Sequence, residues 1–113
     1  MVPILNRLNI GAACVGNHDF DFGVDNLIEL INETNFPWLM SNCFDVKTKK
    51  PLALAHTKHL IDLNDGQLRL GVVGLVEKEW IETLSFLNYD DVIYESFVDV
   101  GRKLANELRN EDV

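Results

Sequence analysis

The segment most informative about the fold is Gly11-Ala-Ala-Cys-Val-Gly16-Asn-His-Asp-Phe-Asp-Phe-Gly23. Residues 11–15 are small and apolar, which is typical of a strand buried on both faces. Residues 16–23 form a polar segment bracketed by glycines. Apolar residues then recur with helical spacing at Val24, Leu27, Ile28 and Ile31. Open α/β sheets bind their ligands in loops that follow a strand and precede a helix. The polar segment at 16–23 occupies such a position.

The same alternation of helix and strand extends to both sides of this stretch. Residues 3–9 begin with a proline and predict a short helix. The helix that starts at residue 24 should end by Asn35, ahead of Pro37. Residues 38–43 read as a second buried strand, and residues 44–55, with three lysines, as an exposed loop.

The second half of the chain predicts a hairpin followed by helices. Asp65-Gly66 favours a tight turn between strands at 57–63 and 68–76, the second apolar enough for a central strand. Residues 77–87 suggest a helix or turn, and residues 88–94 a loop or short strand. The last helix should begin near Ser96, a good N-cap, with Phe97, Val100, Leu104, Ala105 and Leu108 on its apolar face. The order α-β-α-β-β-β-α-α predicts an α/β fold with one strongly apolar sheet.

Length and charge exclude several classes of protein. The 113 residues carry a formal charge of −8, with six basic against eight acidic side chains in residues 1–76 and four against ten in residues 77–113. An acidic chain repels phosphate, so a nucleic-acid groove is not expected. No apolar run reaches the roughly 18 residues of a membrane span. The sequence does not indicate a compartment.

The loop at 16–23 holds the densest group of chemically useful side chains. Asn17 offers a neutral oxygen that suits a divalent cation, and His18 can exchange a proton near neutral pH. Asp21, three residues on, could reach back and orient the imidazole. Phe20 and Phe22 would then point into the core. The alternative is a solvated loop in which Asn17 or Asp21 only caps the following helix.

The octet Gly16-Asn-His-Asp-Phe-Asp-Phe-Gly23 resembles the GNH(D/E)-F-D-x-G block of the calcineurin-like metallophosphoesterases. The likeness is to their 5′-nucleotidase and cyclic-nucleotide phosphodiesterase branch. Residues 5–11, 36–45 and 70–76 are similar to neighbouring elements of that branch, so the resemblance spans most of residues 1–87.

The resemblance implies part of a four-layer αββα sandwich that hydrolyses phosphate mono- or diesters, with nucleotides as the leading substrates. It implies a centre of two divalent metal ions, such as Zn, Mn or Fe, with Asn17 as a ligand of one ion. His18 would act at the phosphate and leaving group, and Asp21 would hydrogen-bond His18. Asp19 would support the loop.

Other blocks of the family are absent from this sequence. Neither the upstream Asp-x-His and Gly-Asp blocks nor the downstream Gly-His and His-x-His blocks is found. The neighbours of His56 and His59 do not match them, so both are expected at the surface or half-buried in a strand. Residues 1–113 are therefore interpreted as a partial catalytic domain, truncated at both ends.

Alone, such a chain is expected to be inactive, to bind no metal stably and to self-associate through exposed sheet edges. The alternatives are a non-catalytic α/β scaffold or interaction domain, and a relative that has lost its metal site.

Three further features have simple structural interpretations. Cys14 and Cys43 lie in apolar stretches and read as small buried hydrophobic residues. Trp80 should turn inward from a charged helix face. Asn42 could support the site from a neighbouring strand.

Overall fold

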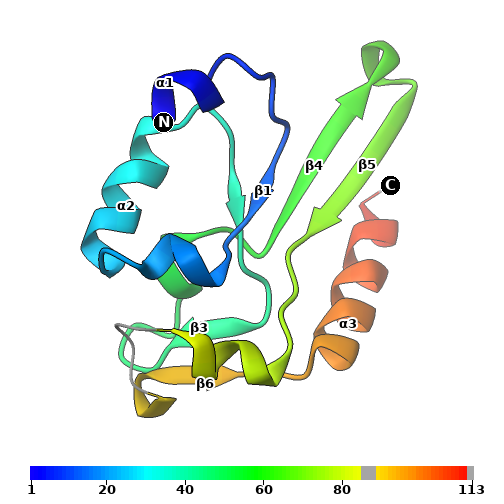
Figure 1. Ribbon diagram of the computed structural model, residues 1–113. Helices are drawn as coiled ribbons and strands as arrows, with labels where there is room; N and C mark the ends of the chain where they lie inside the picture. The colour runs from blue at the N-terminus through cyan, green and yellow to red at the C-terminus, as the bar shows by residue number, and fades with distance from the viewer. Residues whose placement is uncertain (85–88, 112–113) are drawn as a thin grey trace.

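The computed structural model describes residues 1–84 and 89–111 (Figure 1). The N-terminal part contains helix α1 (Val2–Leu5), strand β1 (Ala13–Cys14) and helix α2 (Val24–Glu33). β1 pairs in parallel with β2 (Trp38–Leu39), with Ala13 opposite Trp38. This strand, loop and helix arrangement agrees with the sequence prediction.

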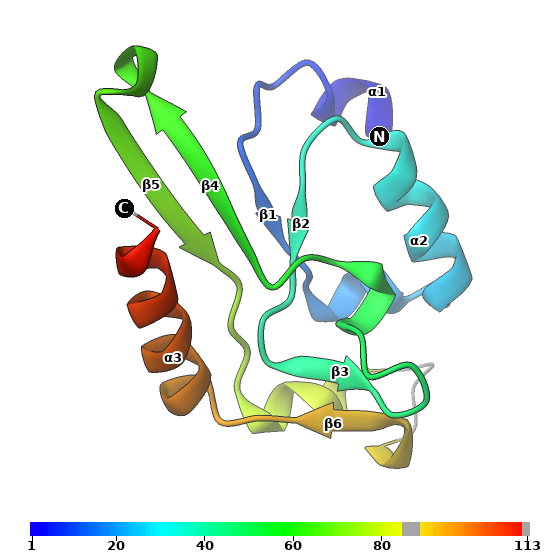
Figure 2. The ribbon, with the colours of Figure 1, turned by 180° about the vertical axis from the view of Figure 1, so that it is seen from behind.

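Two antiparallel pairs follow. β3 (Cys43–Asp45) pairs with β6 (Val92–Tyr94), and β4 (Lys58–Leu63) pairs with β5 (Leu68–Val73). Helix α3 (Phe97–Asn110) ends the described chain and lies beside the β4–β5 hairpin, whereas α2 lies on the far side of β1 and β2 (Figures 1 and 2). Short 3₁₀ helices span Asn17–Phe20, Leu52–Leu54, Asn64–Gly66, Lys78–Thr83 and Tyr89–Asp91.

The α/β class is confirmed, but the prediction of one apolar sheet is wrong for the described residues. They form three two-stranded sheets. The predicted strand at 38–43 breaks after Leu39, because the side chains of Ser41 and Asn42 bond to distant backbone groups. Cys43 then begins a strand that pairs with β6 instead of continuing beside β1.

Several element boundaries also differ from the predictions. The first helix has only four residues, because residues 6–9 form turns, and β1 has two residues instead of five. The segment 44–55 is not simply an exposed loop. Its lysines are exposed, but Leu52 and Ala53 are buried at 3% and 5% exposure, because apolar side chains in this segment enter the core.

The hairpin lies where the sequence predicts it. Asn64, Asp65 and Gly66 all have positive φ, so the turn uses residue types that tolerate the left-handed region. The prediction that the second arm is a central strand is wrong. β5 pairs with β4, and its first four residues are exposed.

The predicted final helix is confirmed. The Ser96 side chain accepts a hydrogen bond from the backbone N–H of Asp99, and Val100, Leu104 and Leu108 are buried. Phe97, expected on the same apolar face, is instead 46% exposed. The predicted strand within 88–94 is β6, and part of the predicted helix or turn at 77–87 lies outside the described residues.

Most of the core lies between α2, the strands and the 3₁₀ helix at Lys78–Thr83. It is built from apolar residues that are distant in sequence, namely Val15, Phe20, Leu27, Met40, Cys43, Leu52, Ala53, Ala55, Ile81, Leu84 and Val92. Trp80 packs against this core, as predicted, with its ring edge-on to Phe20 at a centroid distance of 5.9 Å. No helix in the described ranges is long and apolar enough to cross a membrane.

Asn42 joins three segments inside this core. Its side chain donates to the carbonyl oxygens of Val76 (2.8 Å) and Glu95 (3.0 Å) and accepts from the N–H of Val76 (3.0 Å). The residue is fully buried. The prediction that Asn42 supports the functional loop is wrong, because these bonds connect the ends of β2, β5 and β6 instead.

Replacing Asn42 by Ala should lower the free energy of unfolding by roughly 2–4 kcal/mol. The change removes three hydrogen bonds to part-buried backbone groups of Val76 and Glu95, and each lost hydrogen bond costs about 0.5–1.5 kcal/mol. Denaturant unfolding followed by circular dichroism measures the effect. Asn106→Ala, at an exposed position on α3, is the control and should change stability by less than about 0.5 kcal/mol. Equal denaturant midpoints for Asn42→Ala and Asn106→Ala would contradict a stabilising role of the Asn42 hydrogen bonds.

Candidate functional site

Hydrogen bonds within the loop that follows β1 hold its shape. The N–H of Gly16 donates to Oδ2 of Asp19 at 2.7 Å, and residues 17–20 form one turn of 3₁₀ helix. Asp19 therefore supports the loop, as the sequence predicts. Gly23, with φ of +94°, ends the loop in a conformation that favours glycine, and α2 begins at the next residue.

His18 and Asp21 face each other on this turn. His18 Nδ1 lies 3.1 Å from Asp21 Oδ2. The imidazole is 86% exposed and the carboxylate 43% exposed. Because Nδ1 is engaged, the other ring nitrogen, Nε2, is the one open to a ligand. The predicted pairing of His18 with Asp21 is thus present in the geometry.

Phe20 fixes the turn to the core. Its ring is fully buried, and it lies in the same 3₁₀ turn as His18. Phe22 does not follow the prediction, because its side chain is 84% exposed. The alternation fails because residues 17–20 coil as a 3₁₀ helix, so residues two apart do not share a face as they would in an extended strand.

Asn17 begins the same turn and is half-buried. Within the described residues its side chain makes no hydrogen bond, so its amide oxygen is available to a cation. The same described part of the chain contains no group of three or more His, Cys, Asp or Glu side chains arranged to hold a metal ion. One amide oxygen does not fit a pair of divalent ions, so the residues of this chain alone do not form a two-metal centre.

A pocket of about 270 Å³ opens beside His18, between α1 and α2. Its walls are largely apolar and include Leu27, Leu30 and the exposed Phe22. Asn26 and Trp38 also line it. These two residues were not predictable as pocket residues, because nothing in their local sequence pattern distinguishes them from ordinary helix and strand positions.

The remaining polar candidates lie away from this loop. His56 is exposed and His59 half-buried, as predicted. Both cysteines are free thiols. Cys43 is buried, but the prediction of a buried Cys14 is wrong, because β1 is at the surface and Cys14 is exposed on it.

The thiols nevertheless ionise less readily than usual. Burial raises the pKa of Cys43 to about 12. Partial burial, followed by the charge of the nearby Asp19 carboxylate, raises the pKa of Cys14.

Known proteins resemble this chain over nearly its whole length. A 2′,3′-cyclic-nucleotide 2′-phosphodiesterase/3′-nucleotidase of Salmonella typhimurium is 30% identical over 115 aligned positions, covering 95% of this chain. A 5′-nucleotidase of Bos taurus is 40% identical over 80 positions, covering 66% of the chain. The chain is a relative of the 5′-nucleotidase branch of the calcineurin-like metallophosphoesterases. No family model matches the sequence.

Solved structures share the fold of this 5′-nucleotidase relative. A 5′-nucleotidase precursor from Thermus thermophilus superposes with a TM-score of 0.82 at 21% identity, covering 98% of this chain. The NAD nucleotidase of Haemophilus influenzae gives a TM-score of 0.75 at 19% identity over 99% of the chain. The chain spans only 17% and 13% of the two sequence relatives and 21–22% of the two structures.

Alkaline pH should destabilise the protein through Cys43. The thiol of the unfolded chain loses its proton near pH 9.0, whereas the folded thiol keeps it up to about pH 12. The folded state therefore binds more protons in this window, and the free energy of unfolding falls as pH rises from 9 towards 12. Urea unfolding at several pH values measures this slope. Cys43→Ala should show a shallower slope, and identical slopes would contradict the assignment.

Proposed function

We propose that this chain is part of a metal-dependent phosphoesterase domain that hydrolyses nucleotide phosphate esters. Support comes from the sequence relatives, which are named as nucleotidases and cyclic-nucleotide phosphodiesterases. The observation that carries the proposal is the contact between His18 and Asp21, 3.1 Å apart on an exposed turn that follows a parallel strand.

In this proposal His18 works at the phosphate and the leaving group. An exposed imidazole with Nδ1 turned to a carboxylate can present Nε2 to a phosphate ester from solvent. As an imidazolium, the ring would donate its Nε2 proton to the departing oxygen and become neutral, keeping the Nδ1 proton towards Asp21, or it would stabilise the charge that develops on that oxygen. Asp21 is a positioning residue, because its carboxylate fixes which ring nitrogen faces the substrate.

Asn17 would contribute a ligand to one of two divalent ions. Such ions can bind phosphate oxygens and supply a hydroxide nucleophile. The described side chains offer only this one amide to them, so the other ligands would come from further parts of a longer polypeptide. For this reason the 113 residues alone are proposed to be catalytically inactive, as one partial domain. The proposed metals are Zn, Mn, Fe or similar ions.

The competing function is a non-catalytic α/β domain in which the loop at 16–23 is only a turn. A specific observation favours it, since His18 and Asp21 are exposed and such surface pairs contribute little by themselves. The two functions predict different behaviour once the loop lies in a complete metallophosphoesterase domain. Hydrolysis should depend on His18 only if the loop has the catalytic function.

The direct test uses a longer polypeptide that contains this segment and the rest of such a domain. With Mn²⁺ it should hydrolyse AMP and a chromogenic phosphate ester, and His18→Ala should lower turnover by about 10²–10⁴-fold at unchanged metal content. Asp21→Asn should cause a smaller loss and alter the pH profile of turnover, because it changes the preferred tautomer of His18.

His56→Ala is the matched control, because His56 is an exposed histidine outside the loop. Its turnover should equal that of the unsubstituted polypeptide. Absence of hydrolysis in a folded, metal-loaded polypeptide would overturn the catalytic proposal. Equal losses from His18→Ala and His56→Ala would overturn the role of His18.

A further inference from the structure

Trp80 connects a distant part of the chain to the turn at 17–20. It lies in the 3₁₀ helix Lys78–Thr83. Its ring meets the ring of Phe20 nearly at a right angle, with an interplanar angle of 73° and a centroid distance of 5.9 Å. Aromatic rings in this edge-to-face arrangement attract each other with a preferred orientation, which an aliphatic neighbour does not provide. Trp80 therefore restrains how the Phe20 ring is turned.

The segment around Trp80 gives this ring a fixed base. The N–H of Trp80 donates to the carbonyl of Glu77 at 3.1 Å, and the hydroxyl of Thr83 donates to the carbonyl of Trp80 at 2.6 Å. Glu77, Thr83 and the charged residues between them are exposed, whereas Ile81 is buried and Trp80 packs against the core. These two apolar side chains thus hold the 3₁₀ helix against the core.

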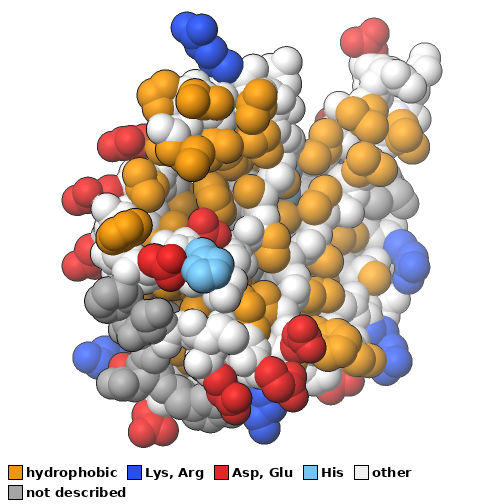
Figure 3. All heavy atoms as spheres, in the orientation of Figure 1, with side chains coloured by type: hydrophobic (Ala, Val, Ile, Leu, Met, Phe, Trp, Pro, Cys, Tyr) orange, Lys and Arg blue, Asp and Glu red, His pale blue; other side chains and the backbone are white. Residues whose placement is uncertain are grey.

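The orientation of the turn at 17–20 depends on the packing of Phe20. Among the four described residues of the turn, only Phe20 is buried, whereas the imidazole of His18 is 86% exposed. The hydrogen bonds of the Asp19 and Asp21 side chains stay within the loop. Figure 3 shows a histidine side chain at the surface, with acidic side chains beside it. A single 3₁₀ turn has poorer hydrogen-bond geometry than an α-helix, so it does not fix its own direction.

We propose that Trp80 is a positioning residue for His18 and acts through Phe20. This role rests on the proposed function, in which Nε2 of His18 faces a phosphate ester. Trp80 fixes the Phe20 ring, the ring fixes the turn, and the turn fixes the direction of the imidazole. The gain is one of geometry, because a displacement of about 1 Å at a reacting group can lower a rate by about 10²-fold. Trp80 itself contacts neither phosphate nor metal in this role.

NMR relaxation on the 113-residue chain tests whether Trp80 holds the turn, independently of activity. The backbone amides of residues 17–21 should have order parameters near 0.85, roughly the value of a rigid backbone. In Trp80→Leu they should fall below about 0.6, because the edge-to-face contact is lost. Trp80→Phe keeps an aromatic ring at this position and should retain the higher order parameters.

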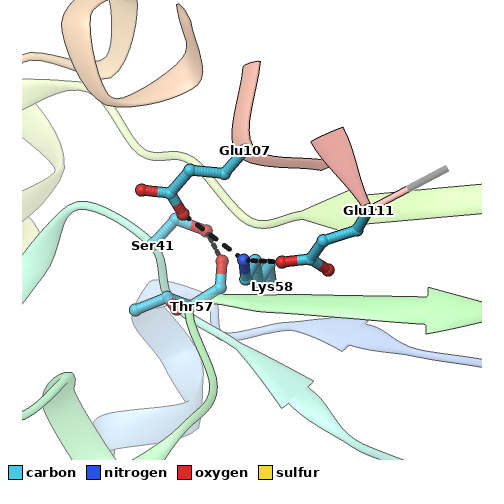
Figure 4. Close-up of polar contacts among 5 residues, drawn as sticks. All are labelled: Ser41, Thr57, Lys58, Glu107 and Glu111. Carbon is cyan, nitrogen blue, oxygen red and sulfur yellow. Dashed lines mark hydrogen bonds and ion pairs between the residues drawn. The ribbon is translucent and has the colours of Figure 1, made fainter. Parts of the chain in front are cut away.

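Helix α3 provides a control site away from this turn. Leu108 on this helix is 5% exposed and packs on Gly71 of the hairpin. Beside this contact, Lys58 Nζ bonds to the carboxylates of Glu107 and Glu111 (Figure 4). These contacts hold α3 on the hairpin and include no residue of the loop that follows β1.

Leu108→Ala is the matched control for Trp80→Leu, because it removes buried apolar volume elsewhere in the structure. Denaturant unfolding should show that both variants lose stability. Leu108→Ala should nevertheless leave the order parameters of residues 17–21 unchanged. If circular dichroism finds Trp80→Leu unfolded, Trp80→Met takes its place, because methionine fills irregular space without an aromatic ring.

A longer polypeptide that carries the rest of the domain tests the link to catalysis. Trp80→Leu should lower kcat about tenfold and leave KM within about twofold, because it disturbs the direction of His18 and not substrate binding. In a His18→Ala background, Trp80→Leu should lower kcat no further, because the imidazole that Trp80 positions is absent. A merely structural role would lower kcat equally in both backgrounds.

Low order parameters at residues 17–21 of the unsubstituted chain would overturn the proposal, because nothing would then hold the turn. Unchanged order parameters in a folded Trp80→Leu chain, or an equal fall in Leu108→Ala, would also overturn it. So would equal losses of kcat with and without His18. Absence of hydrolysis in the longer polypeptide would instead overturn the proposed function, while the order parameters of the 113-residue chain still decide whether Trp80 holds the turn.

Discussion

The hydrogen bonds of Asn42 connect three segments that are far apart along the chain. This fully buried side chain holds the chain at Val76 and Glu95, which lie 34 and 53 residues further on. The backbone N–H of Glu95 donates in turn to the Asn42 carbonyl at 2.9 Å. Ser41 adds a second connection, because its hydroxyl donates to the carbonyl of Thr57 and accepts from the N–H of Gly74. Short strands are thereby fixed relative to one another.

Phe20 connects the loop at 16–23 to the core. Its buried ring and its contact with Trp80 fix the 3₁₀ turn, so the exposed His18 and Asp21 project from a rigid base. A surface pair of this kind has little effect on stability. In the proposed function, the fold determines the direction in which the imidazole points.

Local sequence patterns predicted the elements that are determined by residues close together in the sequence. The 3.6-residue period identified α2 and α3, Ser96 identified the start of α3, and Asp65-Gly66 identified the hairpin turn. The pairing of His18 with Asp21 also follows from a separation of three residues, and the resemblance of the octet at 16–23 indicated the family. The exposed side chain of Phe22 was not predictable from alternation, because the coiling of residues 17–20 depends on how Phe20 packs.

Long-range pairing was not predictable from the same patterns. The strand predicted at 38–43 divides because Ser41 and Asn42 find partners far along the chain, and no local signal marks those partners. The exposure of Cys14 likewise depends on what covers β1. The metal site could not be predicted in full from local patterns either. A metal centre needs several ligands close together, and the described residues bring only the Asn17 amide to this position.

In the proposed function, the fold orients His18 through its contact with Asp21. The ¹⁵N chemical shifts of the imidazole measure this most directly, on the chain alone and in a state where the ring is neutral. We expect the proton to reside mainly on Nδ1, facing Asp21, and Asp21→Asn to shift it towards Nε2. A ring with its proton mainly on Nε2, unchanged by Asp21→Asn, would show that Asp21 does not orient His18.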